Sequence, residues 1–149
     1  MVAPAYVASV TISAIIAGSA LATLGSLSGC SRPVAVQAPD ISSTSGACEP
    51  ILGAAPIRLL GELQRETTPA DAAALAWGDP PIVLACGVQF DVPPDAQILE
   101  VDDVAWVAQS DDAGTVFTTF EADPVIQVRV PAAYRPEVEA LTELSALVP

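Results

Sequence analysis

The chain has 149 residues and a formal net charge of -13, with 18 acidic side chains against five basic ones and no histidine. All five basic residues are arginines, so neither a nucleic-acid-binding surface nor a basic patch for anionic lipid has an electrostatic basis in the overall charge. Without histidine and lysine, Ser-His-Asp catalysis, histidine-ligated zinc and lysine nucleophiles are excluded.

The N-terminal segment is an uncharged apolar stretch. Val2 to Leu27 contains no charged side chain, and the stretch ends in Leu27-Ser28-Gly29-Cys30. This ending resembles the bacterial lipobox, in which an aliphatic residue, two small residues and a cysteine direct lipid attachment to the thiol and cleavage before it. The resemblance implies a signal peptide over residues 1–29, lipidation at Cys30, and a location on the outer face of the cytoplasmic membrane.

Other interpretations of this segment stay open. A run of about 20 apolar residues is long enough to span a bilayer uncleaved, and a cleaved signal without lipid is a second alternative. A third is that Cys30 is an ordinary buried thiol. No basic side chain precedes the apolar run, which departs from the usual signal peptide.

The cysteine count agrees with export. With Cys30 lipidated, only Cys48 and Cys86 remain, an even pair suited to a disulfide in an oxidising compartment. Metal binding or redox catalysis by this pair would require closer spacing or histidine partners. We therefore predict a structural disulfide, with no metal site and no cofactor.

Composition divides the chain after the predicted signal peptide into two segments. Residues 30–47 begin with the lipidated cysteine and are rich in Ser, Pro and Ala, which predicts a flexible tether. Residues 48–149 form a single globular domain. At its start, a broken apolar pattern over residues 51–63 predicts one or two short helices. A second helix is expected over residues 69–77, where Thr68 would cap it, Pro69 would take the first position and Gly78 would end it.

From Ile82 onward, the spacing of apolar residues changes to that of strands. After Pro136 it returns to the spacing of a helix. Short connections between successive strands favour an antiparallel meander. The predicted fold class is α+β: a small antiparallel meander of four or five strands, with helices before it and one C-terminal helix packed on it. The predicted strands cover residues 82–88, 98–101, 104–108, 115–120 and 125–130.

Few side chains are candidates for chemistry. The acidic pairs Asp102-Asp103 and Asp111-Asp112 lie in predicted turns, where aspartate is common, and the second pair does not match a calcium-binding EF-hand loop. We interpret the junction of Trp77, Gly78 and Asp79 as a structural plug beside the predicted disulfide. Ligand recognition through this junction or through Trp106 is the alternative.

Three segments carry a family resemblance: AWGDPPIVLACGV (residues 76–88), DVAWVAQSDDAGTVFTTF (residues 103–120) and VIQVRVPAAYRP (residues 125–136). Together with the upstream cysteine they resemble the actinobacterial DUF3515 family over most of the chain from Cys48. The resemblance implies a small secreted or membrane-associated protein with a cysteine pair. It implies no activity, because the family has no assigned function.

Two classes of function remain. The first is a lipid-anchored extracytoplasmic accessory or binding protein of the cell envelope, with an envelope protein or a small ligand as partner and no enzymatic activity. The second is a carboxylate-dependent envelope hydrolase, which requires carboxylates converging in a cleft. An uncleaved single-pass membrane protein with a structural role is a further alternative.

Overall fold

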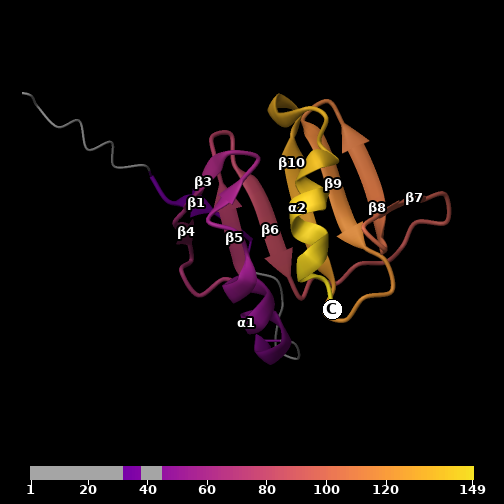
Figure 1. Ribbon diagram of the computed structural model, residues 1–149, viewed down its shortest axis with the longest axis horizontal. Coiled ribbons are helices and arrows are strands. Elements are labelled where there is room, and N and C mark those ends of the chain that lie inside the picture. Colours follow the sequence, from indigo (N-terminus) through magenta and orange to yellow (C-terminus); the bar gives the residue numbers. More distant parts are fainter. Residues whose placement is uncertain (1–31, 38–44) are drawn as a thin grey trace, which may run out of the picture. The chain divides into compact units, whose positions relative to one another are not determined.

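The computed structural model describes residues 32–37 and 45–149. They form a mixed fold that is mostly sheet (Figure 1). The helices are α1 (Ser45–Ala54) and α2 (Glu139–Leu144), with short 3-10 turns at Ala132–Tyr134 and Ser145–Leu147. Eight strands make the main sheet: β2 (Arg58–Leu59), β3 (Glu62–Arg65), β5 (Ala74–Trp77), β6 (Ile82–Cys86), β7 (Gln97–Val101), β8 (Val104–Asp111), β9 (Gly114–Thr119) and β10 (Ile126–Pro131).

The sheet consists of two antiparallel meanders joined side by side. Its strand order is β2-β3-β5-β6-β10-β9-β8-β7. After β6 the chain crosses to β7 at the far edge and returns strand by strand until β10 pairs with β6. The expectation of one small meander with four or five strands is therefore wrong, because the segment before residue 82 also contributes strands.

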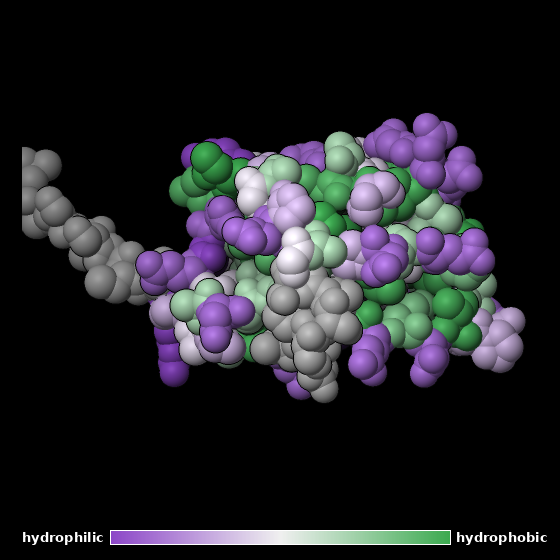
Figure 2. Space-filling view, turned by 90° about the horizontal axis from the view of Figure 1, so that it is seen from below, coloured by the Kyte–Doolittle hydropathy of each residue, from purple (hydrophilic) through white to green (hydrophobic). Residues whose placement is uncertain are grey.

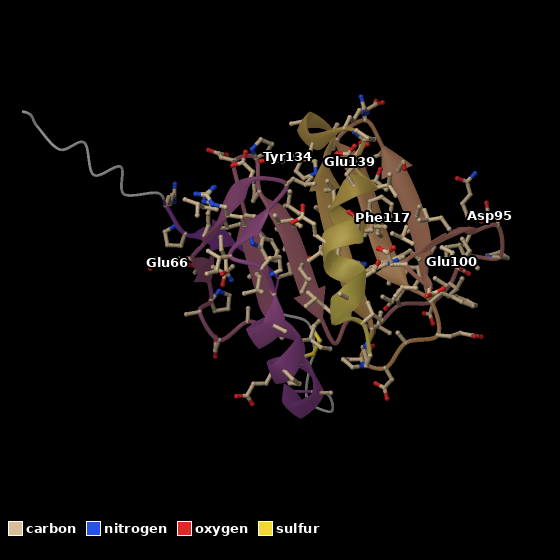
Figure 3. The ribbon with its side chains drawn as sticks, in the orientation of Figure 1. Glu66, Asp95, Glu100, Phe117, Tyr134 and Glu139 are labelled. Carbon is tan, nitrogen blue, oxygen red and sulfur yellow. A yellow bond between two sulfur atoms is a disulfide. The ribbon has the colours of Figure 1, made fainter. Side chains whose placement is uncertain are left out.

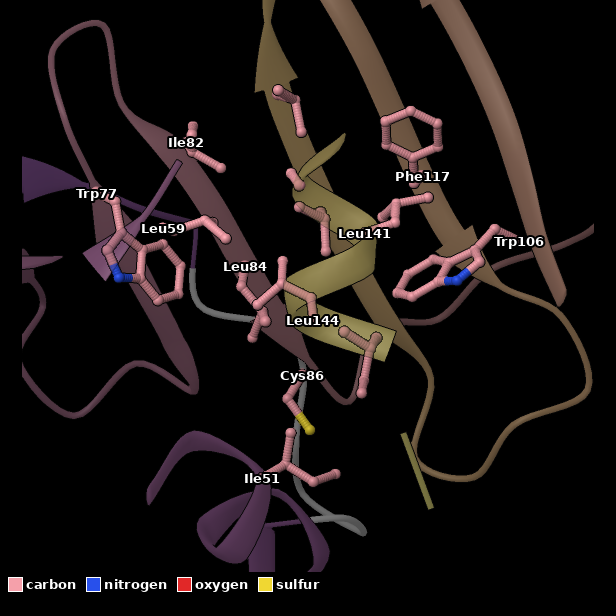
Figure 4. Close-up of a cluster of buried hydrophobic side chains, with 14 of the residues drawn as sticks. Ile51, Leu59, Trp77, Ile82, Leu84, Cys86, Trp106, Phe117, Leu141 and Leu144 are labelled. Carbon is pink, nitrogen blue, oxygen red and sulfur yellow. The ribbon is translucent and has the colours of Figure 1, made fainter. Parts of the chain in front are cut away.

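One face of the sheet carries the hydrophobic core. Strand alternation directs Ile82, Leu84 and Cys86 of β6 to the same face as Val128 of β10. This face is covered by α2, whose Leu141 and Leu144 are buried among the strand side chains, as predicted for the C-terminal helix (Figure 4). The largest fully buried side chains are Trp77, Trp106, Leu59, Ile82, Leu84, Ile126, Leu141 and Leu144.

The predicted helix over residues 69–77 is wrong. Residues 74–77 form β5, which pairs with both β3 and β6. The sequence ALAW has the alternation of a strand: Leu75 and Trp77 point to the core face, while Ala74 and Ala76 point to the other. Pairing on both sides of the strand outweighs the helical preference of alanine.

The region predicted as one or two helices over residues 51–63 is only partly helical. α1 begins earlier, at Ser45, and ends at Ala54, after which β2 and β3 form a hairpin. Its two turn residues, Leu60 and Gly61, have φ values of 50° and 82°. Positive φ at both turn positions is typical of the tightest hairpins, and a glycine in the second position suits it.

The chain upstream of the domain makes a further strand. We call residues 32–37 the strap; its β1 (Val34–Ala35) pairs in parallel with β4 (Thr67–Thr68). The Val34 N–H donates to the Glu66 carbonyl at 2.8 Å, and the Val36 N–H donates to the Thr68 carbonyl at 3.0 Å. The described part of the predicted tether thus lies on the domain, which differs from a freely flexible linker.

The predicted disulfide between Cys48 and Cys86 is present, with a Cα–Cα distance of 5.7 Å. It joins α1 to β6, and both cysteines are buried. Within the described ranges, no helix has the length and apolar character needed to cross a membrane. The predicted signal peptide and Cys30 lie outside those ranges.

Candidate functional site

The junction predicted around Trp77 lies where β5 turns toward β6. Trp77 is fully buried, and its indole N–H donates to the Pro56 carbonyl at 2.9 Å. The indole packs in the core together with Leu59 and Ile82 (Figure 4). Because the ring has no exposed area, Trp77 fills the core and offers no surface for recognition.

Gly78 follows Trp77 in a conformation that excludes a side chain. Its φ is +71°, and a Cβ atom there would collide with the Tyr134 hydroxyl and would lie 2.8 Å from Cγ of Glu62. Backbone conformation and crowding therefore both require glycine at this position. Asp79, the next residue, is exposed in the turn.

The edge cleft is the hollow beside this junction, and it has a volume of about 490 Å³. Arg65 ties its walls together, because Nη1 donates to the Gly78 carbonyl at 2.8 Å and Nη2 donates to the Arg32 carbonyl of the strap at 2.7 Å. Among the described residues its Nε has no hydrogen-bond partner. The cleft is lined by Arg32, Glu62, Leu63, Gln64, Arg65, Gly78 and Asp79.

Tyr134, from the C-terminal part of the chain, packs against the junction beside Gly78. Its hydroxyl donates to the Pro80 carbonyl at 2.8 Å. The pKa of the Tyr134 phenol is raised above its usual value of 10.0. Burial is the largest cause, and the neighbouring Glu62 carboxylate is the second. The neutral phenol is therefore the form that the fold favours.

Trp106, the other aromatic candidate, is fully buried in β8. Its indole N–H lies 3.4 Å from Oγ of Ser145, just after α2, and its ring lies in the core with Phe117 and Leu144 (Figure 4). Trp106 therefore helps to hold α2 on the sheet and is not part of an exposed site.

The two acidic pairs are turn residues. Asp102 and Asp103 are exposed, with φ values of 50° and 66°, in the two-residue turn between β7 and β8. Oδ1 of Asp111 accepts hydrogen bonds from the N–H groups of Ala113 and Gly114, at 2.8 and 3.1 Å. These are the turn roles that aspartate fills through positive φ and side-chain acceptors. In the part of the chain that the structure describes, no three cysteine, aspartate or glutamate residues are grouped to hold a metal ion.

Other hollows of the described residues lie elsewhere on the domain. The sheet hollow, about 250 Å³, lies between the strap and the face of the sheet opposite α2, where Gln127 and Arg129 project beside Val83 and Ala85. The apolar groove, about 350 Å³, lies between α1 and the C-terminal residues. Its lining is Ala47, Pro50, Ile51, Ala54, Asp123, Pro124, Ala146, Leu147 and Pro149.

Arg65, the strap and the contact between Tyr134 and Gly78 are the parts of this site that were not predicted from the sequence. An isolated arginine and a tyrosine 69 positions apart carry no spacing signal, because only the fold brings them to Gly78. The strap had a weak signal, since Val34 and Val36 alternate with Ala35 and Gln37.

The comparisons with known proteins agree with the sequence resemblance. Curated proteins and solved structures give no match. The family described as "Protein of unknown function (DUF3515)" matches residues 5–149, and the chain therefore belongs to the DUF3515 family.

Proposed function

We propose that this protein is a lipid-anchored extracytoplasmic accessory or binding protein of the cell envelope. The observation that carries the proposal is the use of the three cysteines. Cys48 and Cys86 are joined in the core, which leaves Cys30 as the one cysteine outside the disulfide. That cysteine stands at the last position of the lipobox-like Leu27-Ser28-Gly29-Cys30, after an uncharged apolar run.

The disulfide also favours an oxidising compartment, where such bonds persist. On the chain-entropy account, closing a loop of 38 residues stabilises the fold by about 4 kcal/mol. A domain of this size has a net stability of about 5–15 kcal/mol, so the bond is a large share of it. Export to an oxidising compartment would keep the disulfide formed and so preserve its contribution to stability.

A binding or accessory role is favoured over a hydrolase by the placement of the acidic side chains. A glycosidase mechanism uses two carboxylates facing each other across about 5–9.5 Å of a cleft. Both aspartate pairs instead lie in exposed turns, at opposite ends of β8. The apolar groove beside α1 is a surface suited to an apolar ligand or an envelope partner.

Neither tryptophan is available to a binding surface. Both tryptophans are fully buried, and in Figure 2 hydrophobic residues at the surface are interrupted by hydrophilic ones. A partner would therefore meet mixed aliphatic and acidic surface, which suits a weak or accessory interaction better than a large permanent interface.

Metabolic labelling with a fatty-acid analogue tests the anchor. The wild-type chain is expected to carry label and to stay in the membrane fraction, whereas Cys30→Ala is expected to lose the label. Leu27→Asp keeps the thiol but disrupts the apolar position of the motif, and should also lose the label. Ser31→Ala is the matched control and should be labelled like the wild type. Wild-type protein that is unlabelled and retains residues 1–29 would favour the uncleaved helix instead.

A further inference from the structure

We infer that the sheet edge formed by β2 and β3, together with the start of the strap, is a membrane-facing surface that lies against anionic phospholipid headgroups. This inference rests on the proposed function, because it takes the lipid on Cys30 as the anchor. It replaces the picture of a domain held away from the bilayer on a tether with that of a domain held against it.

The strap holds the first described residues of the chain on the domain. Nη2 of Arg65 holds the Arg32 carbonyl at 2.7 Å, and the N–H groups of Val34 and Val36 bind the segment around β4. The side chain of Val34 is buried. Cys30 is two residues before Arg32, a reach of about 7 Å. The proposed lipid on Cys30 would therefore be joined to the chain two residues before the strap.

The side chains around that point suit a lipid interface. Arg58 pairs with Leu63 across the hairpin, so both project from one face of it, and Arg65 follows Leu63 by two residues on the same face. Leu63 is 52% exposed and the adjoining Ile57 is 74% exposed, the two highest values among the large hydrophobic residues of the described chain. Exposed aliphatic side chains beside arginines are typical of surfaces that lie at the headgroup boundary.

Charge is distributed unequally along the sheet. Arg32, Arg58 and Arg65 are three of the five basic residues, and every charged side chain between Arg65 and Arg129 is acidic. In Figure 3, Asp95 and Glu100 lie at the β7 end of the sheet, opposite the end that carries the strap. The strand order places β2 and β7 at opposite edges, and seven strand spacings separate them by about 34 Å.

This asymmetry favours one orientation on an anionic membrane. Glu62, Glu66 and Asp79 also lie near the strap, and the Glu143 carboxylate accepts from the Leu60 N–H at the hairpin turn, so the membrane-facing surface is mixed in sign rather than a basic patch. The β7 edge has acidic side chains without any arginine, and a tilt that lowered it to the headgroups would be opposed by like charge. The headgroup field decays within about 8 Å at physiological salt, so the raised edge escapes it.

The test uses the chain that begins at Cys30 with its disulfide intact, in which Cys30 is the one free thiol. A maleimide lipid coupled to that thiol anchors the protein on phosphatidylglycerol nanodiscs doped with a gadolinium-chelating lipid. We expect paramagnetic loss of the amide signals of Ile57 to Glu66, and retention of those of Gln97 to Asp103. Equal loss at both edges, or stronger loss at β7, would overturn the inference.

Two variants test whether the named side chains hold the orientation. Ile57 and Leu63 are exposed, so the double variant Ile57→Ser/Leu63→Ser is expected to fold and to lose the difference in signal loss between the edges. Ile98, 51% exposed on β7, supplies the matched control, and Ile98→Ser should keep that difference. An unchanged difference in the double variant would show that these side chains do not face the lipid.

The coupling chemistry separates the two proposals. Because the lipid is attached in vitro, an equal loss at both edges defeats only the membrane-facing surface. An unlipidated Cys30 in cells would defeat the proposed function, while the nanodisc result would still report how the domain lies on a bilayer.

Discussion

At Gly78, backbone conformation and packing act together. We predict that Gly78→Ala lowers the free energy of unfolding by more than the 1–2 kcal/mol expected of the left-handed conformation alone, because the added Cβ also meets Tyr134 and Glu62. The control is Gly61→Ala, where φ is +82° but no atom lies within 4 Å of the added Cβ. Denaturant unfolding of both variants measures the difference, and equal losses would contradict the crowding at Gly78.

Tyr134 gives the fold a pH dependence in the alkaline range. Its pKa is raised by burial and by Glu62, so the native state keeps the phenolic proton at pH values where the unfolded chain has lost it. Tyr134 is therefore predicted to add no pH dependence to stability below about pH 10, and its titration to lower stability as the pH rises from about 10 through the folded pKa.

The chain that begins at Cys30 isolates this titration, because it contains no lysine and Tyr134 is its single tyrosine. Phenolate absorbance of the native protein should rise at higher pH than that of the denatured protein. Tyr134→Phe should abolish the alkaline loss of stability, while costing about 1 kcal/mol at neutral pH for the hydrogen bond to Pro80. An alkaline loss that persists in Tyr134→Phe would rule out this group as its source.

The element that depends most on the disulfide is α1. Pro50 and Gly53 make it a poor helix on its own, and within it the buried side chains are those of Cys48 and Ile51. Replacing the pair, as Cys48→Ser/Cys86→Ser, is predicted to lower the free energy of unfolding by about 4 kcal/mol. Hydrogen exchange should accelerate first in α1 and last in β6 and β10. Uniform acceleration would contradict a local role of the bond.

The strap depends on alternate backbone N–H groups. Val36→Pro removes the donor to Thr68 and is predicted to release residues 32–37, with a change of less than about 1 kcal/mol in global stability. Ala35→Pro is the control, since successive N–H groups of a strand point in opposite directions and Val34 and Val36 supply those that face β4. Faster proteolysis before Cys48 in Val36→Pro alone is the expected outcome, and equal cleavage of both variants and the wild type would disprove the docking.

Strands with a clear alternating or continuous apolar pattern were predictable at this scale. β6, β8, β9 and β10 and the C-terminal helix lie where the sequence predicts them. The segment before β6 was not predictable, because the alanines of β5 favour a helix locally and become a strand only through pairing with β3 and β6. The crossover from β6 to β7 at the far edge, which lets β10 pair with β6, has no local signal either.

The candidate site was also predictable only where its residues are neighbours in the sequence. Gly78 and its neighbours stand in one continuous motif, so their role at a junction followed from the sequence. The partners that complete the junction, Arg65 and Tyr134, reach it only through tertiary structure. The disulfide was predictable because assigning Cys30 to the lipobox-like motif leaves one pair of cysteines.

At the scale of the whole molecule, the features align along one direction. The strap and three of the five arginines belong to one end of the sheet, and the edge formed by β7 carries acidic side chains. On our proposal, this distribution of charge orients the domain on an anionic membrane. It also leaves the apolar groove, which lies between α1 and the C-terminal residues, available to a partner.

The central claim is that the mature protein begins at a lipid-modified Cys30. Intact-mass measurement of the protein extracted from the membrane fraction tests it most directly. We predict a mass equal to residues 30–149 with the Cys48–Cys86 disulfide formed, plus the mass of lipid attached to the N-terminal cysteine. A mass that includes residues 1–29, or one that begins at Cys30 without added lipid, would contradict the claim.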